Sequence, residues 1–160
     1  MPEVQLISRA MFPALLERAA GLARRRTNHN FHPSLEDNPH RFLNVMLRGT
    51  YVRPHRHLAP PKAETFLALE GRIACFLFDG AGAVREAHVL DWRETCGIDI
   101  APGLWHSIAV LSEHAVCFEV KPGPYQPAAD KDFAPWAPPE DDPAAPAYLE
   151  ALLRTLERRP

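Results

Sequence analysis

The chain has 160 residues, the length of a single domain with a substantial core. Its formal net charge of −2 gives none of the strongly basic character that attracts nucleic acids or anionic membranes, so we expect neither as a partner. No apolar run has the length of a signal peptide or a membrane span, which predicts a cytoplasmic location.

An amphipathic helix is predicted near the N-terminus, from about Ser8 to Arg26. Apolar residues recur there near a 3.6-residue period, at Phe12, Leu15, Leu16, Ala19, Leu22 and Ala23. Pro13 fits the first helical turn, where a missing N–H costs little. We expect the arginines at positions 24–26 to form a solvated helix end, since cations complement the helix dipole there.

Short apolar or alternating runs, broken by turn residues, fill residues 41–120. Their spacing predicts an all-β sandwich or barrel. Cys75 and Cys117 lie in two of these runs and are expected to be small buried thiols. Together with Cys96 they are odd in number and far apart, which does not fit a disulfide framework or a thiolate zinc site.

The C-terminal part combines a proline-rich segment with a short helix. Eight prolines between positions 122 and 146 predict an extended segment that wraps the surface. The helix after it carries the apolar residues Tyr148, Leu149, Leu152, Leu153 and Leu156. We therefore expect one compact domain with three parts: a helix and lead-in segment (1–39), a barrel (40–121), and the wrap with its helix (122–160).

A histidine pair, His55 and His57, carries the main chemical signal. In an extended strand these two side chains point to the same face, because side chains alternate with a period of two. Glu64 follows at the expected start of the next strand, and His106 follows a Pro-Gly turn further along the chain. Three neutral imidazoles and one carboxylate suit a divalent transition metal such as Fe, Zn, Mn or Ni.

The spacing of these residues resembles the two motifs of the cupin family. The first motif is matched by Gly49, His55, His57, Glu64 and Gly71, with six residues before the glutamate where three or four are usual. The second motif is matched more loosely, at Gly103 and His106. The resemblance implies a cupin double-stranded β-helix, a small jelly-roll barrel, with the two helices at its ends.

Several longer motifs are similar to those of the WbuC family of cupin-fold metalloproteins. They are "NHNFH", "YVRPHRH", "FLALEG", "EVKPGPY" and "KDFAPWAP". The resemblance implies a bound metal and a role near surface-polysaccharide metabolism, such as O-antigen biosynthesis. It does not imply a particular reaction.

Strand parity also places Tyr51 and Arg53 on the face of the two histidines, provided that Pro54 does not reset the alternation. Both are therefore candidate catalytic residues. An inward guanidinium needs a partner. That partner is either an internal carboxylate such as Glu119 or the phosphate or carboxylate group of an anionic ligand, for example an anionic sugar or acid.

The same parity places Phe66 and Ala68 inward with Glu64, and Leu67 and Leu69 outward. The outer leucines need a cover, and a second copy of the chain would supply one, so we expect a homodimer. The other histidines, His29, His32, His40, His88 and His114, are expected on the surface or in loops. The alternative is that the "NHNFH" segment reaches the barrel mouth.

Three functions remain open at this point. The first is a metal-dependent isomerase or epimerase acting on a sugar or sugar nucleotide. The second is an Fe(II)-dependent dioxygenase, because the same ligands suit iron and dioxygen. The third is a module that binds a small ligand through its metal without catalysis. A fold by itself does not separate them.

Overall fold

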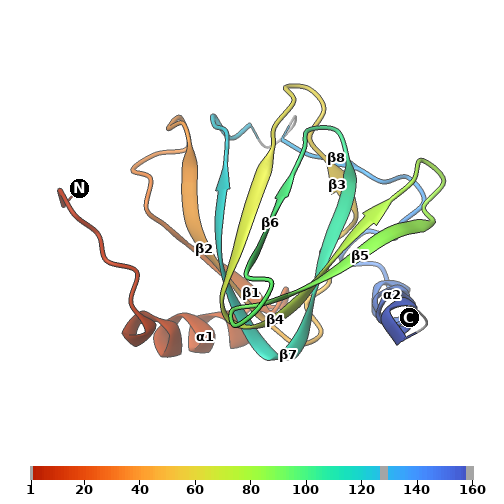
Figure 1. The fold of residues 1–160 in the computed structure, drawn as a ribbon, viewed down its shortest axis with the longest axis horizontal. Helices are drawn as coiled ribbons and strands as arrows, with labels where there is room; N and C mark the ends of the chain where they lie inside the picture. The colour runs from red at the N-terminus through yellow and green to blue at the C-terminus, as the bar shows by residue number, and fades with distance from the viewer. Residues whose placement is uncertain (1, 127–129, 158–160) are drawn as a thin grey trace.

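A computed structural model of the protein describes residues 2–126 and 130–157. One antiparallel sheet of eight strands curves into a half-barrel that is open at one end (Figure 1). The strands are β1 (Arg26–Asn30), β2 (His40–Leu47), β3 (His55–Arg56), β4 (Glu64–Phe78), β5 (Val84–Asp91), β6 (Gly97–Ile100), β7 (Trp105–Lys121) and β8 (Asp132–Phe133). The fold is cupin-like, as the sequence predicts.

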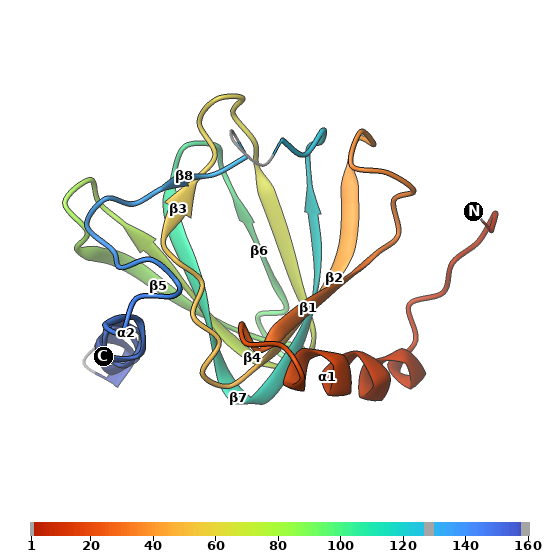
Figure 2. The same cartoon turned by 180° about the vertical axis from the view of Figure 1, so that it is seen from behind.

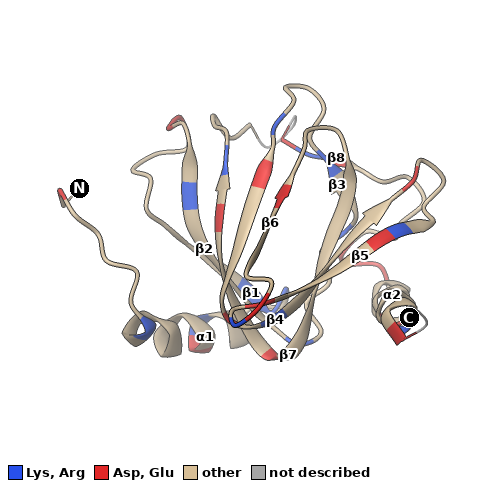
Figure 3. Ribbon diagram, in the orientation of Figure 1, with Lys and Arg blue, Asp and Glu red and all other residues tan. Residues whose placement is uncertain are grey.

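Two long strands, β4 and β7, form the spine of the half-barrel. They pair along almost their whole lengths, from Thr65 opposite Val120 to Phe78 opposite Trp105, with register shifts around Gly71. The last part of β7 also pairs with β2, and its start pairs with β3. Acidic and basic residues are interspersed over the strands (Figure 3).

The N-terminal helix α1 (Phe12–Ala20) lies against the outer face of the sheet beside β1 and β2 (Figure 2). A 3-10 turn (Arg9–Met11) precedes it, and the Ser8 hydroxyl accepts a hydrogen bond from the Ala10 N–H. The buried stripe Phe12, Leu15 and Ala19 packs on apolar side chains of β2 and β7. The helix is therefore predicted correctly in position and face, but it is shorter than residues 8–26.

The arginines at positions 24–26 do not form a helix end. The helix ends at Ala20, with Gly21 as its C-cap, and Arg26 begins β1. β1 pairs with β2 and so extends the sheet to residues before the expected barrel range of 40–121. β1 is an edge strand that pairs with β2 along its whole length, so the sheet satisfies its backbone groups on that side. At the other end, β8 also joins the sheet from within the proline-rich segment.

The C-terminal helix α2 (Ala145–Glu157) packs on the outer side of β4 and β7 through Leu149 and Leu152. Inside the half-barrel, Phe66 and Ala68 are buried, as strand parity predicts, whereas Leu67 is 40 % exposed and Leu69 packs against the α1 cluster. Among the described residues, no helix is long and apolar enough to cross a membrane.

Candidate metal centre

The sheet brings the predicted ligands together from three strands. β3 pairs with β7 so that His55 lies directly opposite His106. His57 follows β3, and its carbonyl oxygen accepts a hydrogen bond of 3.0 Å from the N–H of Gly103 in the turn before β7. The connection to β4 folds back at Leu58 and Pro61, which form a β-bridge, and so the longer loop still delivers Glu64.

Four potential ligand atoms, one each from His55, His57, Glu64 and His106, lie within 4.8 Å of one another. All four residues are at most 4 % exposed. The Nε2 atom of His106 is 2.8 Å from Glu64 Oε2, and the Nε2 atom of His57 is 3.0 Å from Glu64 Oε1. Ligands about 2.1 Å from a shared ion are separated by roughly 3.0–3.4 Å, so these spacings suit one metal ion.

The second ring nitrogen of each histidine fixes its tautomer. The Nδ1 atoms of His55 and His106 each lie 2.9 Å from a backbone carbonyl, that of Arg53 and of Leu104, and His57 Nδ1 contacts the carbonyl of Asp130. An Nδ1–H that donates to a carbonyl leaves the Nε2 lone pair free, which is the usual support of a metal-binding histidine.

With the proton of each ring on Nδ1, the Nε2 lone pairs face Glu64, so the 2.8 Å pair of His106 Nε2 and Glu64 Oε2 needs either a proton or a cation between the two atoms. His57 Nε2 is buried and near Glu64, but it is not aligned for a hydrogen bond and has no other partner in the described parts of the chain. Lone pairs on imidazoles and a carboxylate repel unless a cation or extra protons lie between them. The residues present therefore fit a divalent metal ion and could hold one.

Burial and neighbouring charges keep these groups in the forms that bind metals. Burial lowers the pKa of His55 well below its ordinary value, so this imidazole is neutral at neutral pH. Burial alone would raise the pKa of Glu64. The imidazoles of His106 and His57 and the ammonium of Lys121 outweigh that effect and hold the pKa well below its usual range.

A buried network of charged side chains contacts two of the potential metal ligands. The Lys121 ammonium lies 3.2 Å from Glu64 Oε1 and 3.4 Å from Asp130 Oδ2. The second oxygen of Asp130 accepts a hydrogen bond of 2.8 Å from Lys62. Because Asp130 also contacts His57 through its backbone carbonyl, this network fixes the orientation of one potential ligand.

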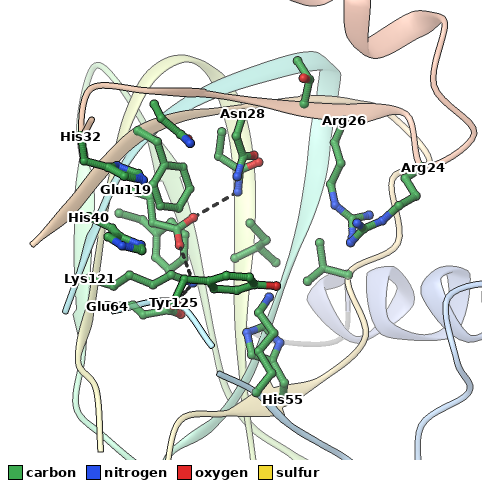
Figure 4. Close-up of a pocket in the computed structure, with 18 of the residues that line it drawn as sticks. Arg24, Arg26, Asn28, His32, His40, His55, Glu64, Glu119, Lys121 and Tyr125 are labelled. Carbon is green, nitrogen blue, oxygen red and sulfur yellow. Dashed lines mark hydrogen bonds and ion pairs between the residues drawn. The ribbon is translucent and has the colours of Figure 1, made fainter. Parts of the chain in front are cut away.

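His55, Glu64 and His106 line a cavity of about 380 Å³ inside the half-barrel, whereas His57 is not among its lining residues. In Figure 4, Glu64, Lys121 and Glu119 lie on one side with His32 and His40, whereas Arg24 and Arg26 lie across the space. A cavity of this volume is within the usual range for small-molecule sites.

Tyr51 and Arg53 do not line this cavity, contrary to the parity argument. Residues 51–54 form no strand, so the alternation does not carry through Pro54. The Arg53 guanidinium donates to the carbonyl oxygen of Ala134 at 2.8 Å and lies over the Phe133 ring. The Tyr51 hydroxyl donates to the carbonyl of Pro138 at 3.0 Å, on the side of α2.

Two histidines expected on the surface or in loops, His32 and His40, line the cavity instead. Their rings stack in parallel with centroids 4.2 Å apart, and both are buried. The pairing of β1 with β2 brings the "NHNFH" segment to the barrel, the alternative raised from the sequence. His88 is exposed, as expected.

Other cavity residues were missed at the level of sequence, although a signal exists for them. Glu119 and Lys121 share the face of buried Cys117 on β7, because they follow it at intervals of two. Asn44 likewise sits in the middle of an apolar strand, β2. Polar residues at strand positions that face inward predict a polar cavity there rather than a packed apolar core.

The DUF6016 family model, described as a domain of unknown function, matches residues 7–90. This range contains His55, His57 and Glu64 and ends before His106. No curated protein matches the chain.

Three solved structures illustrate the similarity of fold. The capsular polysaccharide assembling protein CapF from Staphylococcus aureus has a TM-score of 0.58 and 19 % identity, covering 71 % of this chain and 33 % of CapF. The protein TT1209 from Thermus thermophilus has a TM-score of 0.51 and 18 % identity, covering 67 % of this chain and 92 % of that one. NovW from Streptomyces spheroides, a 4-keto-6-deoxy sugar epimerase, has a TM-score of 0.50 and 19 % identity, covering 58 % and 49 %. The chain thus spans about a third of CapF and half of NovW.

Proposed function

The chain belongs to the DUF6016 family, whose function is unknown, and from its site we propose that it is a metal-dependent enzyme acting on a small anionic sugar or acid. The observation that carries the proposal is the convergence of His55, His57, Glu64 and His106 on one point at the end of a cavity. A divalent ion held there would polarise a carbonyl group or organise adjacent hydroxyl groups of a substrate.

The charge of the cavity wall favours an anionic substrate. Arg24, Arg26 and Lys131 all line the cavity. The two arginines share a single carboxylate, Glu140, at 2.8 Å and 2.6 Å. Lys131 makes no ion pair within the described part of the chain. A bound metal ion would add two further positive charges, so an anion is the complementary ligand.

Isomerisation or epimerisation of a sugar or sugar nucleotide is the reaction class that we favour. The similarity in fold to a 4-keto-6-deoxy sugar epimerase and to a capsular polysaccharide assembling protein is in keeping with it. So is the resemblance of the sequence motifs to the WbuC family, and a role in surface-polysaccharide metabolism is part of the proposal.

An Fe(II)-dependent oxygenase is the second candidate, and the ligand chemistry is what favours it. Three neutral imidazoles and one carboxylate also suit ferrous iron with open positions for dioxygen. A module that binds a small ligand without catalysis would use the same four residues and the same cationic wall.

Elemental analysis of protein purified without added metal or chelator tests the proposal. Iron at about one ion per chain supports the oxygenase, whereas zinc, manganese or nickel favours the sugar-directed enzyme or the non-catalytic module over it. A thermal-shift comparison of anionic sugars with their neutral counterparts then tests the substrate class. Protein that holds no metal and is not stabilised by added divalent ions would refute the metal-dependent function.

A further inference from the structure

A second carboxylate, that of Glu119, lines the cavity beyond the candidate metal ligands. It lies on β7 opposite Phe42 of β2 and Phe66 of β4, and it is 5 % exposed. A carboxylate in such surroundings needs compensation for its lost hydration. The way in which Glu119 is compensated indicates its role.

The compensation is incomplete. The nearest cation, Lys121 Nζ, is 3.6 Å from Glu119 Oε1, farther than it is from Glu64 at 3.2 Å and from Asp130 at 3.4 Å. One ammonium group is therefore shared among three carboxylates, and Glu119 has the weakest share. Lys121 contacts both Glu64 and Glu119, and both carboxylates line the same cavity.

Asn44 is the other partner, and it serves both forms of the carboxyl group. Its Nδ2 donates to Glu119 Oε2 at 3.2 Å, which suits the carboxylate. Its Oδ1 is buried and finds no hydrogen-bond partner in the described residues. A half-turn of the amide would present this oxygen to a protonated Glu119, so the pair stays hydrogen-bonded whether or not the proton is present.

Burial raises the pKa of Glu119 to about 7, Lys121 opposes the shift, and Glu64 adds to it, while Lys131 lowers the pKa. The polar and charged side chains that line the cavity from β1, β2 and the segment between them are Arg26, Thr27, Asn28, Asn30, His32, His40 and Asn44. Glu119 thus populates both protonation states near neutral pH, as a general acid–base group requires.

We propose that Glu119 is the catalytic proton-transfer residue for a small anionic hydroxy-carbonyl compound bound in this cavity. The proposal rests on the proposed function and specifies its substrate class. The Glu119 carboxylate takes the proton from the carbon next to the carbonyl. The C–H electron pair becomes a carbon–carbon double bond, and the carbonyl π pair moves to oxygen. Glu119 then returns the proton to the neighbouring carbon, the former carbonyl carbon, while the hydroxyl proton passes to the oxygen that had accepted the π pair. A new carbonyl forms on the first carbon, which gives the isomer and restores the carboxylate.

The test follows exchange of carbon-bound protons in D2O by NMR, with dihydroxyacetone phosphate and fructose 6-phosphate as probes and fructose as the neutral counterpart. We expect exchange by metal-loaded wild-type protein with a phosphate probe. Glu119→Gln should lower it by at least about 100-fold while metal content is unchanged. Glu113→Gln, an exposed residue of the same strand, is the matched control and should exchange like wild type.

A pH profile of the wild type guards against a variant that fails to fold. Because the carboxylate is the base, exchange should rise with pH and level off. Its inflection should lie at or below pH 7, since a bound cation lowers the pKa of a nearby carboxyl. Glu119→Asp should retain part of the exchange.

Retention of exchange in a folded, metal-loaded Glu119→Gln protein would overturn the assignment. Tyr125 also lines the cavity, and loss of exchange in Tyr125→Phe with none in Glu119→Gln would assign the proton transfer to the tyrosine instead. If the phosphates bind without exchange, or do not bind at all, the ligand class and the role of Glu119 are refuted. Absence of metal in the wild type would instead refute the proposed function, which the metal analysis reports separately.

Discussion

Removal of the His57 imidazole should abolish most of the stabilisation that a metal gives this protein. At a metal concentration 100 times the dissociation constant, binding adds about 2.7 kcal/mol to the free energy of unfolding. One kcal/mol corresponds to about 2–4 °C in a chain of this size, so metal should raise the melting temperature by about 5–11 °C.

The loss follows from the number of potential ligands. Altering a residue that only supports a ligand weakens metal binding by about 10–100-fold, and removal of one of four ligands should reach at least the upper end. A 100-fold weaker site leaves about 0.4 kcal/mol at the same metal concentration, or roughly 1 °C.

The assay is a thermal-shift measurement on chelator-treated protein, with and without zinc. The metal-induced shift is compared within each variant, because His57→Ala also leaves the Asp130 carbonyl without its partner and destabilises the metal-free protein by about 1–3 kcal/mol. His88→Ala, whose side chain is 45 % exposed, should behave like wild type. An equal metal-induced shift in His57→Ala and wild type would refute the ligand assignment.

Four further predictions concern stability and assembly. Glu119→Gln should stabilise the metal-free protein increasingly as pH rises from about 4.5 to 7. The raised pKa of Glu119 in the folded state makes the wild-type protein lose stability over that pH window, and the variant escapes the loss. Urea unfolding at pH 5 and 8 measures the difference, and an equal effect at both pH values would contradict it. Lys62→Met should lower the free energy of unfolding by about 3 kcal/mol, because buried Asp130 loses its closest cation. An unchanged urea midpoint would be incompatible with that reasoning. Gly71→Ala should lower the free energy of unfolding by about 2 kcal/mol or more, because φ is 74° at this position and a Cβ would overlap a carbonyl of β7. Melting curves measure the change, and a wild-type melting temperature would argue against it. The chain should form a homodimer that covers exposed Leu67, and light scattering that showed a monomer at tens of micromolar would point the other way.

Errors in the sequence-based prediction arose where a local rule was extended beyond its element. The period of two predicted the burial of Phe66 and Ala68 correctly, because both lie inside β4. The same rule failed for Arg53, since no strand runs through residues 51–54. Parity is a property of a continuous extended backbone, and a proline that interrupts the strand ends its validity.

The amino-acid sequence by itself determined the all-β class, the two amphipathic helices and the identity of the four potential metal ligands. The class and the helices depend on periodicity over a few residues, which follows from local backbone geometry. The ligands are widely spaced in the chain, and the resemblance to the cupin motifs is what grouped them. Only the tertiary structure decided what surrounds the ligands. The carbonyl of Asp130 reaches His57 across 73 positions in the chain, and Asn44 meets Glu119 across 75. Contacts of that kind exist only after β2, β4 and β7 have paired, because which strands become neighbours depends on closing long loops around a shared core rather than on any local pattern.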